Sequence, residues 1–253
     1  MIRIDSVTKR HGALTAVDDV TLEIGTGLTA IIGPNGAGKS TLLSAVGRLT
    51  PTTAGSITVD GLDVHETPSR EIAKRLAILR QDNHLAIRLS VEDLVSYGRF
   101  PHGSSGRGPE DREAVERAIG LLDLGEVRDR FLDQLSGGQR QRAFVAMALA
   151  QDTDHLLLDE PLNNLDPRHA VALMSLLRDQ VAERGLTIVV VLHDINVAAQ
   201  YADDIVAMKA GRVIHHGDVD DVITAPNLTD LYDTTARVAE LDGSRVVLWG
   251  APR

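Results

Sequence analysis

Apolar and polar residues alternate over the first 32 residues of the chain in a pattern typical of β-strands. The pattern predicts strands over residues 2–8, 17–24 and 28–32. The third strand runs directly into a glycine-rich turn, after which apolar residues at helical spacing predict a helix from Lys39 to about residue 49. The chain therefore begins with β-structure and enters its first helix through that turn.

Helical patterns without a convincing strand occupy residues 90–150. Before them, the segments SITVDG and RLAILRQ indicate strands on either side of a charged helix, with Gln81 just past the second strand. The glycines and prolines of FPHGSSGRGP, residues 100–109, predict a loop within the helical region. After it, the apolar runs HLLLDE and LTIVVVLHD predict two more strands, joined by a helix over residues 167–184. The helical region is therefore interpreted as an insertion.

Strands that alternate with helices are typical of a parallel sheet covered by helices, so the sequence predicts an α/β fold. Two shorter strands are predicted at residues 205–208 and 212–216, and the tail after them gives no indication of its role. We expect one domain over residues 1–253. Its expected parts are a core of residues 1–83 and 151–217, a helical subdomain of residues 84–150 and a small C-terminal extension of residues 218–253.

The charge of the chain argues against a stable complex with nucleic acid. Lys and Arg number 26 and Asp and Glu 36, which gives a net charge of −10 and a pI near 5.3, whereas basic surfaces dominate binding to a phosphate backbone. The lack of cysteine excludes disulfides and thiolate metal sites. No apolar run approaches the roughly 18 residues of a membrane span, and the charged, alternating start is typical of a strand rather than a signal peptide. Any work at a membrane is therefore expected to depend on partners.

The segment GPNGAGKST, residues 33–41, fits the phosphate-loop pattern G-x-x-x-x-G-K-[ST] between a buried strand and a helix. Its glycines let the backbone approach closely, and successive N–H groups at the helix start hold phosphates. Lys39 is expected to span the β- and γ-phosphates, and the Ser40 hydroxyl is placed for Mg²⁺. The nucleotide-binding residues predicted here are Gly33, Pro34, Asn35, Gly36, Ala37, Gly38, Lys39, Ser40 and Thr41.

Two carboxylates end the apolar strand HLLLDE, at the edge where open α/β sheets bind ligands. Asp159 is expected to hold Mg²⁺, and Glu160 to orient or deprotonate a water that attacks the γ-phosphate. A strand that ends in Asp-Glu is by itself more often a solvated turn, and His193 and Gln81 near other strand ends are by themselves ordinary polar residues. Together with the phosphate loop, however, the pair favours hydrolysis over binding alone.

The segment LSGGQRQR, residues 135–142, places two glycines at the start of a predicted helix and exposes backbone N–H groups to an anion without a lysine. A helix N-terminus stabilises an anion by only about 0.3 to 2 kcal/mol, too little to capture a nucleotide unaided. The segment is therefore expected to complete a site built elsewhere, in this chain or in another. The sequence contains neither the N-K-x-D guanine reader of GTP-binding proteins nor the arginine-rich lid of small-molecule kinases.

The phosphate loop, Gln81, LSGGQ, LLLDEP, NNLD and LHD occur in the order typical of the ATP-binding-cassette (ABC) family, whose nucleotide-binding domain the sequence resembles over residues 2–217. The resemblance implies a P-loop NTPase core with a mostly parallel sheet, an N-terminal antiparallel β-subdomain and an inserted helical subdomain. It also implies an ATPase that uses ATP and Mg²⁺. Two copies would meet head to tail, so that LSGGQ of one copy caps the γ-phosphate on Lys39 of the other. The capping residues would be Ser136, Gly137, Gly138 and Gln139.

The resemblance further assigns roles to single residues. Glu160 would be the catalytic base, His193 the switch residue that contacts the γ-phosphate, and Gln81 a sensor of Mg²⁺ and the attacking water. Asp166 of NNLD would contact the other subunit. His11 stands where the family commonly has the aromatic residue that stacks on adenine. The Mg²⁺ ligands would be Ser40, Gln81 and Asp159.

VSYGRFPH, residues 95–102, and the segment from QRQRAFVAMALAQ to NNLD are similar to the ATPases of ferric-siderophore importers, a group that includes haem and cobalamin systems. This implies a peripheral subunit at the cytoplasmic face of the cell membrane, bound to two permease subunits that a substrate-binding lipoprotein serves. Cargo would pass through the permeases, so no iron site is expected here. The alternatives are importers of haem, cobalamin or another metal chelate, an exporter cassette, and a soluble ABC ATPase. The single cassette without heptads or membrane spans and the charge of −10 argue against the last two.

Overall fold

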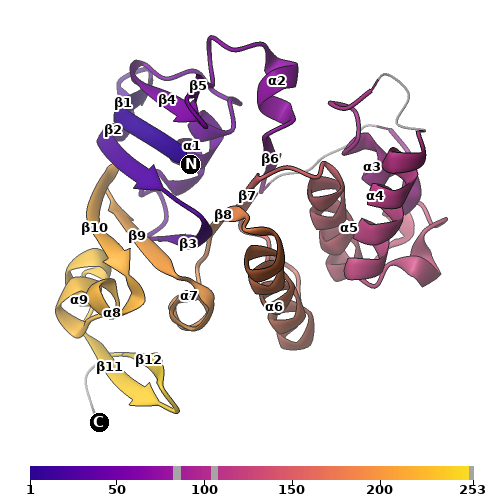
Figure 1. The fold of residues 1–253 in the computed structure, drawn as a ribbon. Helices are drawn as coiled ribbons and strands as arrows, with labels where there is room; N and C mark the ends of the chain where they lie inside the picture. The colour runs from indigo at the N-terminus through magenta and orange to yellow at the C-terminus, as the bar shows by residue number, and fades with distance from the viewer. Residues whose placement is uncertain (82–86, 104–107, 251–253) are drawn as a thin grey trace.

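The computed structural model describes residues 1–81, 87–103 and 108–250. Its strands form a four-stranded sheet, a six-stranded sheet and a two-stranded hairpin, with helices packed around them (Figure 1). The boundary predicted between residues 83 and 84, and residues 104–107 of the predicted loop, lie outside the described residues. Within the described part of the chain, no helix has both the length and the apolar character needed to cross a bilayer.

The four-stranded sheet is antiparallel, with the strand order β2-β1-β4-β5. The first two strands extend past the predicted ends because Gly12, with φ 60°, closes a two-residue turn between His11 and Leu14. Buried apolar residues of β1 face the first helix, α1. The bounds are β1 (Ile2–His11), β2 (Leu14–Ile24), β4 (Ala54–Val59), β5 (Leu62–Asp63) and α1 (Lys39–Val46).

The six-stranded sheet has the order β10-β9-β3-β8-β7-β6, and all neighbouring pairs except β10 with β9 are parallel. Every residue of β3, β7 and β8 is buried, as expected for strands covered on both faces. The carboxyl ends of these three strands therefore meet at one edge of the sheet. The bounds are β3 (Gly27–Ile32), β6 (Leu76–Leu79), β7 (His155–Asp159), β8 (Thr187–Val191), β9 (Asp204–Lys209) and β10 (Arg212–Asp218).

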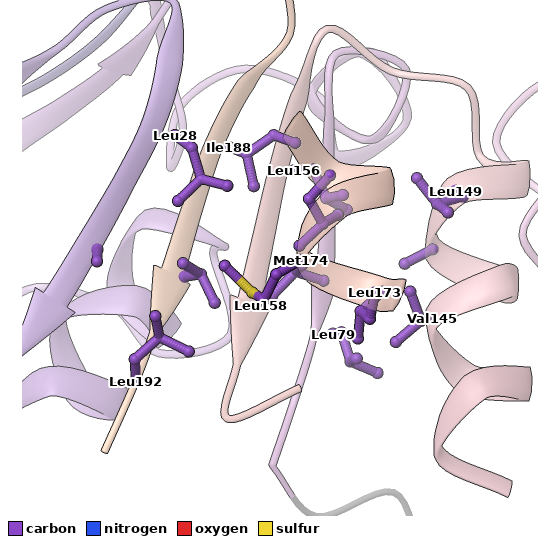
Figure 2. Close-up of a cluster of buried hydrophobic side chains, with 14 of the residues drawn as sticks. Leu28, Leu79, Val145, Leu149, Leu156, Leu158, Leu173, Met174, Ile188 and Leu192 are labelled. Carbon is purple, nitrogen blue, oxygen red and sulfur yellow. The ribbon is translucent and has the colours of Figure 1, made fainter. Parts of the chain in front are cut away.

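The core on one face of this sheet joins α6 (Pro167–Arg184) to the helical insertion. Figure 2 shows Leu173 and Met174 of α6 beside β7 and Leu79, with Val145 of α5 (Gly137–Ala150) close to them. These four side chains are at most 2% exposed, and burial of each contributes about 1.5–3 kcal/mol. The insertion and the sheet thus share one hydrophobic core.

Helices dominate the insertion, as predicted, and no strand occurs among its described residues. Its first helix, α3, starts with a capping box in which the Ser90 hydroxyl accepts a hydrogen bond from the Asp93 N–H. Helices α3 and α4 pack against α5 (Figure 1). The bounds are α3 (Val91–Tyr97), α4 (Pro109–Leu121), η1 (Gly125–Val127) and η2 (Leu132–Gln134).

Arg99 ties the three helices of the insertion together. Its Nε donates to Asp111 Oδ1 at 3.0 Å, at the start of α4, and a guanidinium N–H donates to the carbonyl of Ala150 at 3.0 Å, at the end of α5. The neighbouring Gly98 has no room for a side chain, since a Cβ there would overlap the carbonyl oxygen of Met147. Gly98 and Arg99, just before the predicted loop, are therefore buried, whereas Phe100, the first residue of that loop, is exposed.

Replacement of Arg99 by alanine is expected to lower the free energy of unfolding by about 3 to 5 kcal/mol, because it leaves the Asp111 carboxylate without its buried partner. The Arg99 guanidinium holds the pKa of Asp111 below its usual range, which marks the pair as stabilising. Denaturant titration measures the loss. Arg3→Ala is the control, since the Arg3–Glu23 pair is more than half exposed on both sides and should contribute about 1 kcal/mol or less. Equal losses of unfolding free energy in Arg99→Ala and Arg3→Ala would contradict the stabilising role of the Arg99–Asp111 pair.

The remaining elements are short helices and the C-terminal hairpin. The predicted charged helix is α2, and α7 follows β8 directly. The tail contains α8 and α9 and ends in strands β11 and β12, below the six-stranded sheet in Figure 1. The bounds are α2 (Ser69–Ala73), α7 (Ile195–Tyr201), α8 (Val219–Val222), α9 (Ala225–Tyr232), β11 (Ala236–Leu241) and β12 (Ser244–Trp249).

Candidate active site

The phosphate loop connects β3 to α1, and two glycines fix its path. Gly33 has φ 145° and Gly38, the residue before α1, has φ 100°. A Cβ on Gly33 would overlap the carbonyl oxygen of Met208, and a Cβ on Gly38 would overlap that of Ala16. Because only glycine fits both positions, the loop can curl tightly over the sheet edge and open into α1.

A cleft of about 630 Å³ opens over this loop. Its wall brings together segments that lie far apart in the sequence, from the end of β1 to the turn between β9 and β10. It contains most of the predicted phosphate-loop residues together with Gln81, Glu160 and His193. The described lining residues are His11, Leu14, Thr15, Ala16, Asn35, Gly36, Ala37, Gly38, Lys39, Ser40, Thr41, Gln81, Glu160, His193, Ala210 and Gly211.

The Lys39 ammonium lies inside the loop and is only 5% exposed as a residue. Its Nζ donates to the carbonyl oxygens of Gly33 at 2.8 Å and Pro34 at 3.1 Å. Burial lowers the pKa of Lys39, and the carboxylates of Glu160 and Asp159 oppose that shift. The lysine is thus a cation held by neutral carbonyls, which phosphate oxygens can replace with stronger, charge-assisted bonds.

Ser40 and Asp159 lie side by side at the sheet edge, with Ser40 Oγ donating to Asp159 Oδ1 at 2.9 Å. Burial raises the pKa of Asp159, and the Glu160 carboxylate raises it further. A cation between the Ser40 hydroxyl and the Asp159 carboxylate would offset the negative charge of the two neighbouring carboxylates. Hydroxyl and carboxylate oxygens, with the Gln81 amide oxygen nearby, are the ligands that Mg²⁺ prefers, so the donor set fits the metal predicted here.

The Glu160 carboxylate is the centre of a polar network. Gln81 Nε2 donates to Glu160 Oε2 at 2.7 Å, and His193 Nε2 lies 2.6 Å from Oε1. Asn163 Nδ2 also donates to Oε2 at 2.7 Å. Glu160 itself has φ 52°, which is uncommon for a residue with a side chain and is concentrated at functional sites. The structure therefore gathers Gln81, Glu160 and His193, as the sequence predicted.

Asn163 was not singled out by the sequence, although it belongs to the NNLD segment that was. Its amide reaches Glu160 because the chain turns back over residues 160–163, where the Asn163 N–H donates to the Glu160 carbonyl at 3.3 Å. Ala210 and Gly211 of the cleft wall also went unnoticed, since nothing in their local sequence relates them to the phosphate loop. There the Gly211 N–H donates to the carbonyl of Ala37 at 3.0 Å.

A profile of the family described as ABC transporter matches residues 17–163, a range that contains the phosphate loop and Glu160. The chain belongs to the ABC transporter family. The resemblance stated from the order of the motifs is thereby confirmed.

Two curated relatives match nearly the whole chain. The petrobactin import ATP-binding protein YclP of Bacillus subtilis (strain 168) is 45% identical over 247 residues, which cover 97% of this chain and 98% of YclP. The petrobactin import ATP-binding protein FatE of Bacillus anthracis is 47% identical over 239 residues, which cover 94% of this chain and 96% of FatE. The solved dimeric structure of MJ0796, a bacterial ABC transporter cassette, has a TM-score of 0.79 at 30% identity and covers 87% of this chain and 99% of that one. The predicted fold and ATPase class are confirmed.

The LSGGQ segment, here called the ABC signature segment, lies outside the wall of this chain's own cleft. The Ser136 hydroxyl caps α5 by accepting a hydrogen bond from the Gln139 N–H at 3.2 Å, and Gln139 Oε1 accepts from the Ser136 N–H at 3.1 Å. A Cβ on Gly137 would lie 3.3 Å from that of Asn164, and one on Gly138 would lie 3.2 Å from the Asn164 carbonyl oxygen. The signature glycines therefore pack against the NNLD segment.

Two other predicted residues have clear positions. Asp166 caps α6. Its Oδ1 accepts a hydrogen bond from the His169 backbone N–H at 2.9 Å and lies 2.8 Å from His169 Nδ1. The His169 backbone bond is the main cause that lowers the pKa of Asp166. His11 ends β1 at the cleft wall, where the described lining contains no Tyr, Phe or Trp. His11 thus stays the predicted adenine neighbour.

Proposed function

We propose that this ABC ATPase energises the import of an iron(III)–siderophore complex through two permease subunits, bound at the cytoplasmic face of the cell membrane. The observation that carries the proposal is the match to YclP and FatE over at least 94% of this chain, both of them petrobactin import ATPases. A ferric siderophore such as ferric petrobactin is accordingly the first cargo to test, and a substrate-binding lipoprotein would deliver it.

The residues of the cleft support a direct hydrolysis of the γ-phosphate. Lys39 and the loop N–H groups of residues 36–41 bind and orient the phosphates. Ser40, Asp159 and Gln81 would hold Mg²⁺, and the ion would supply positive charge to offset the negative charge of the phosphates. Glu160 accepts a proton from the attacking water, and His193, 2.6 Å from Oε1, fixes the carboxylate and faces the γ-phosphate position.

The second half of the site comes, in this proposal, from another copy of the chain. Ser136, Gly137 and Gly138 do not line the nucleotide cleft of their own chain, so they would leave a γ-phosphate bound there uncovered on one side. A head-to-tail dimer would place these N–H groups over the γ-phosphate of the partner, with Asp166 at the interface. ATP would then join the two copies, and hydrolysis would release them.

Transport by a strain that lacks the gene tests the cargo. Uptake of radioactive iron as a ferric siderophore, ferric petrobactin first, is expected to fall to background and to be restored by the wild-type gene but not by Lys39→Ala. Haem and cobalamin uptake are measured in parallel and are expected to stay unchanged. Intact uptake of every ferric siderophore offered, with loss of haem or cobalamin uptake, would contradict the siderophore assignment and favour one of the alternative importers.

A further inference from the structure

Tyr232, the last residue of the C-terminal helix α9, contacts the start of the phosphate loop. The Gly33 N–H, the first of the phosphate loop, donates to the Tyr232 hydroxyl oxygen at 3.1 Å. The carbonyl of the same glycine accepts from Lys39 Nζ at 2.8 Å. One residue of the loop is therefore held on one side by Tyr232 and on the other by the lysine that binds phosphate.

Several contacts fix the Tyr232 ring in place. The Trp249 ring of β12 packs edge-on against it, with 5.2 Å between centroids and 74° between planes. Lys209 at the end of β9 binds the Asp230 carbonyl and Asp233 Oδ1, which anchors the end of α9 to the central sheet. Burial raises the pKa of Tyr232 to about 12, so the phenol keeps its proton throughout the physiological range.

The hairpin that carries Trp249 is also attached to helix α7. Asn196 Oδ1 accepts a hydrogen bond from the Val247 N–H at 2.7 Å, and Asn196 Nδ2 donates to the Val247 carbonyl at 3.4 Å. Asn196 lies in α7, three residues after His193. Two hydrogen bonds thus hold the hairpin to α7 and fix the position of the strand that carries Trp249.

We propose that Tyr232 is a positioning residue for nucleotide binding, which holds the start of the phosphate loop when Lys39 leaves the loop carbonyls for the phosphates. In the free protein Lys39 and Tyr232 both hold Gly33. When Lys39 turns to a phosphate, its hydrogen bond to the Gly33 carbonyl breaks. The hydrogen bond from the Gly33 N–H to the Tyr232 hydroxyl is then the one of the two that remains. The proposal rests on the phosphate loop being the ATP site, which binding of MgATP to the wild-type protein tests separately.

Tyr232→Phe in the full-length chain removes the hydroxyl but keeps the ring against Trp249. A net hydrogen bond of about 0.5 to 1.5 kcal/mol corresponds to a loss of affinity of about twofold to tenfold. We expect the Kd and KM for MgATP to rise about fivefold, with kcat within about twofold of wild type, because Gln81, Glu160 and His193 are untouched. Calorimetric titration measures the change in Kd, and steady-state ATPase assays measure KM and kcat separately. Tyr201→Phe is the matched control, since Tyr201 is partly buried and its hydroxyl makes no hydrogen bond within the described residues.

Two variants of Trp249 keep the test decisive if Tyr232→Phe folds poorly. Trp249→Ala is expected to raise KM in the same direction, and Trp249→Phe, which restores an aromatic edge, to recover most of the wild-type value. A KM within about 1.5-fold of wild type in both Tyr232→Phe and Trp249→Ala would overturn the proposal, even if their melting temperatures fall. A fall in kcat at unchanged KM would overturn it as well.

Discussion

Exchange of Glu160 for glutamine is expected to lower the ATP turnover rate by at least about a hundredfold while MgATP binding is retained. Glutamine keeps the shape and the contacts of Glu160 with Gln81 and Asn163, but it cannot take a proton from the attacking water, and a positioned base contributes about 10²–10⁴ to such a rate. Steady-state ATPase assays and nucleotide titration measure the two effects. Glu183→Gln, the same exchange at an exposed position of α6, is the control.

The same variant tests the proposed dimer. With hydrolysis stalled, Glu160→Gln should run as a dimer on gel filtration in MgATP and as a monomer without nucleotide. A protein that binds MgATP and still runs as a monomer at high concentration would contradict the intersubunit clamp. Full ATPase activity of an isolated wild-type monomer would contradict it independently.

Loss of the Lys39 ammonium is expected to abolish ATP turnover and to weaken MgATP binding by at least about a hundredfold. Two charge-assisted hydrogen bonds to phosphate, at about 1.5 to 3 kcal/mol each, correspond to a factor of this size. Lys39→Ala is compared with wild type by calorimetric titration and by phosphate release. Binding that weakens less than about tenfold would show that the ammonium does not hold the phosphates.

Lys9→Ala is the matched control for that substitution. Lys9 is also buried, and its Nζ also donates to a backbone carbonyl, that of Pro51 at 2.7 Å, yet it does not line the cleft. Its loss should affect the melting temperature without the large fall in nucleotide affinity. The pair of variants therefore separates the loss of a buried cation from the loss of a phosphate ligand.

Local signals explain which parts of the fold could be predicted from sequence. Helix α6 begins and ends where predicted, because Asp166 caps it, Pro167 suits its first position and Gly185 closes it with φ 67°. The buried strands β3, β7 and β8 were likewise recognisable as apolar runs. The phosphate loop needed only its own nine residues and their position between a strand and a helix.

Contacts between distant segments explain what could not be predicted. The role of Arg99, next to the predicted loop, could not be predicted because its partners, Asp111 and Ala150, lie 12 and 51 positions away. Tyr232 is 199 positions from Gly33, and the weak alternation of the tail does not relate the two. The family motifs assigned Gln81, His193 and Glu160 to one ATP site, but the contacts of Gln81 and His193 with Glu160 could not be predicted, because periodicity carries no information about such contacts.

The two loop carbonyls that hold the Lys39 ammonium act as a built-in competitor for anything that enters the cleft. Any anion that draws Lys39 away leaves both carbonyls without the ammonium, so it must bind the lysine more strongly than the two carbonyls do together. An anion that binds Lys39 weakly therefore gains little by displacing these carbonyls, which favours a ligand with several charged oxygens, such as a polyphosphate.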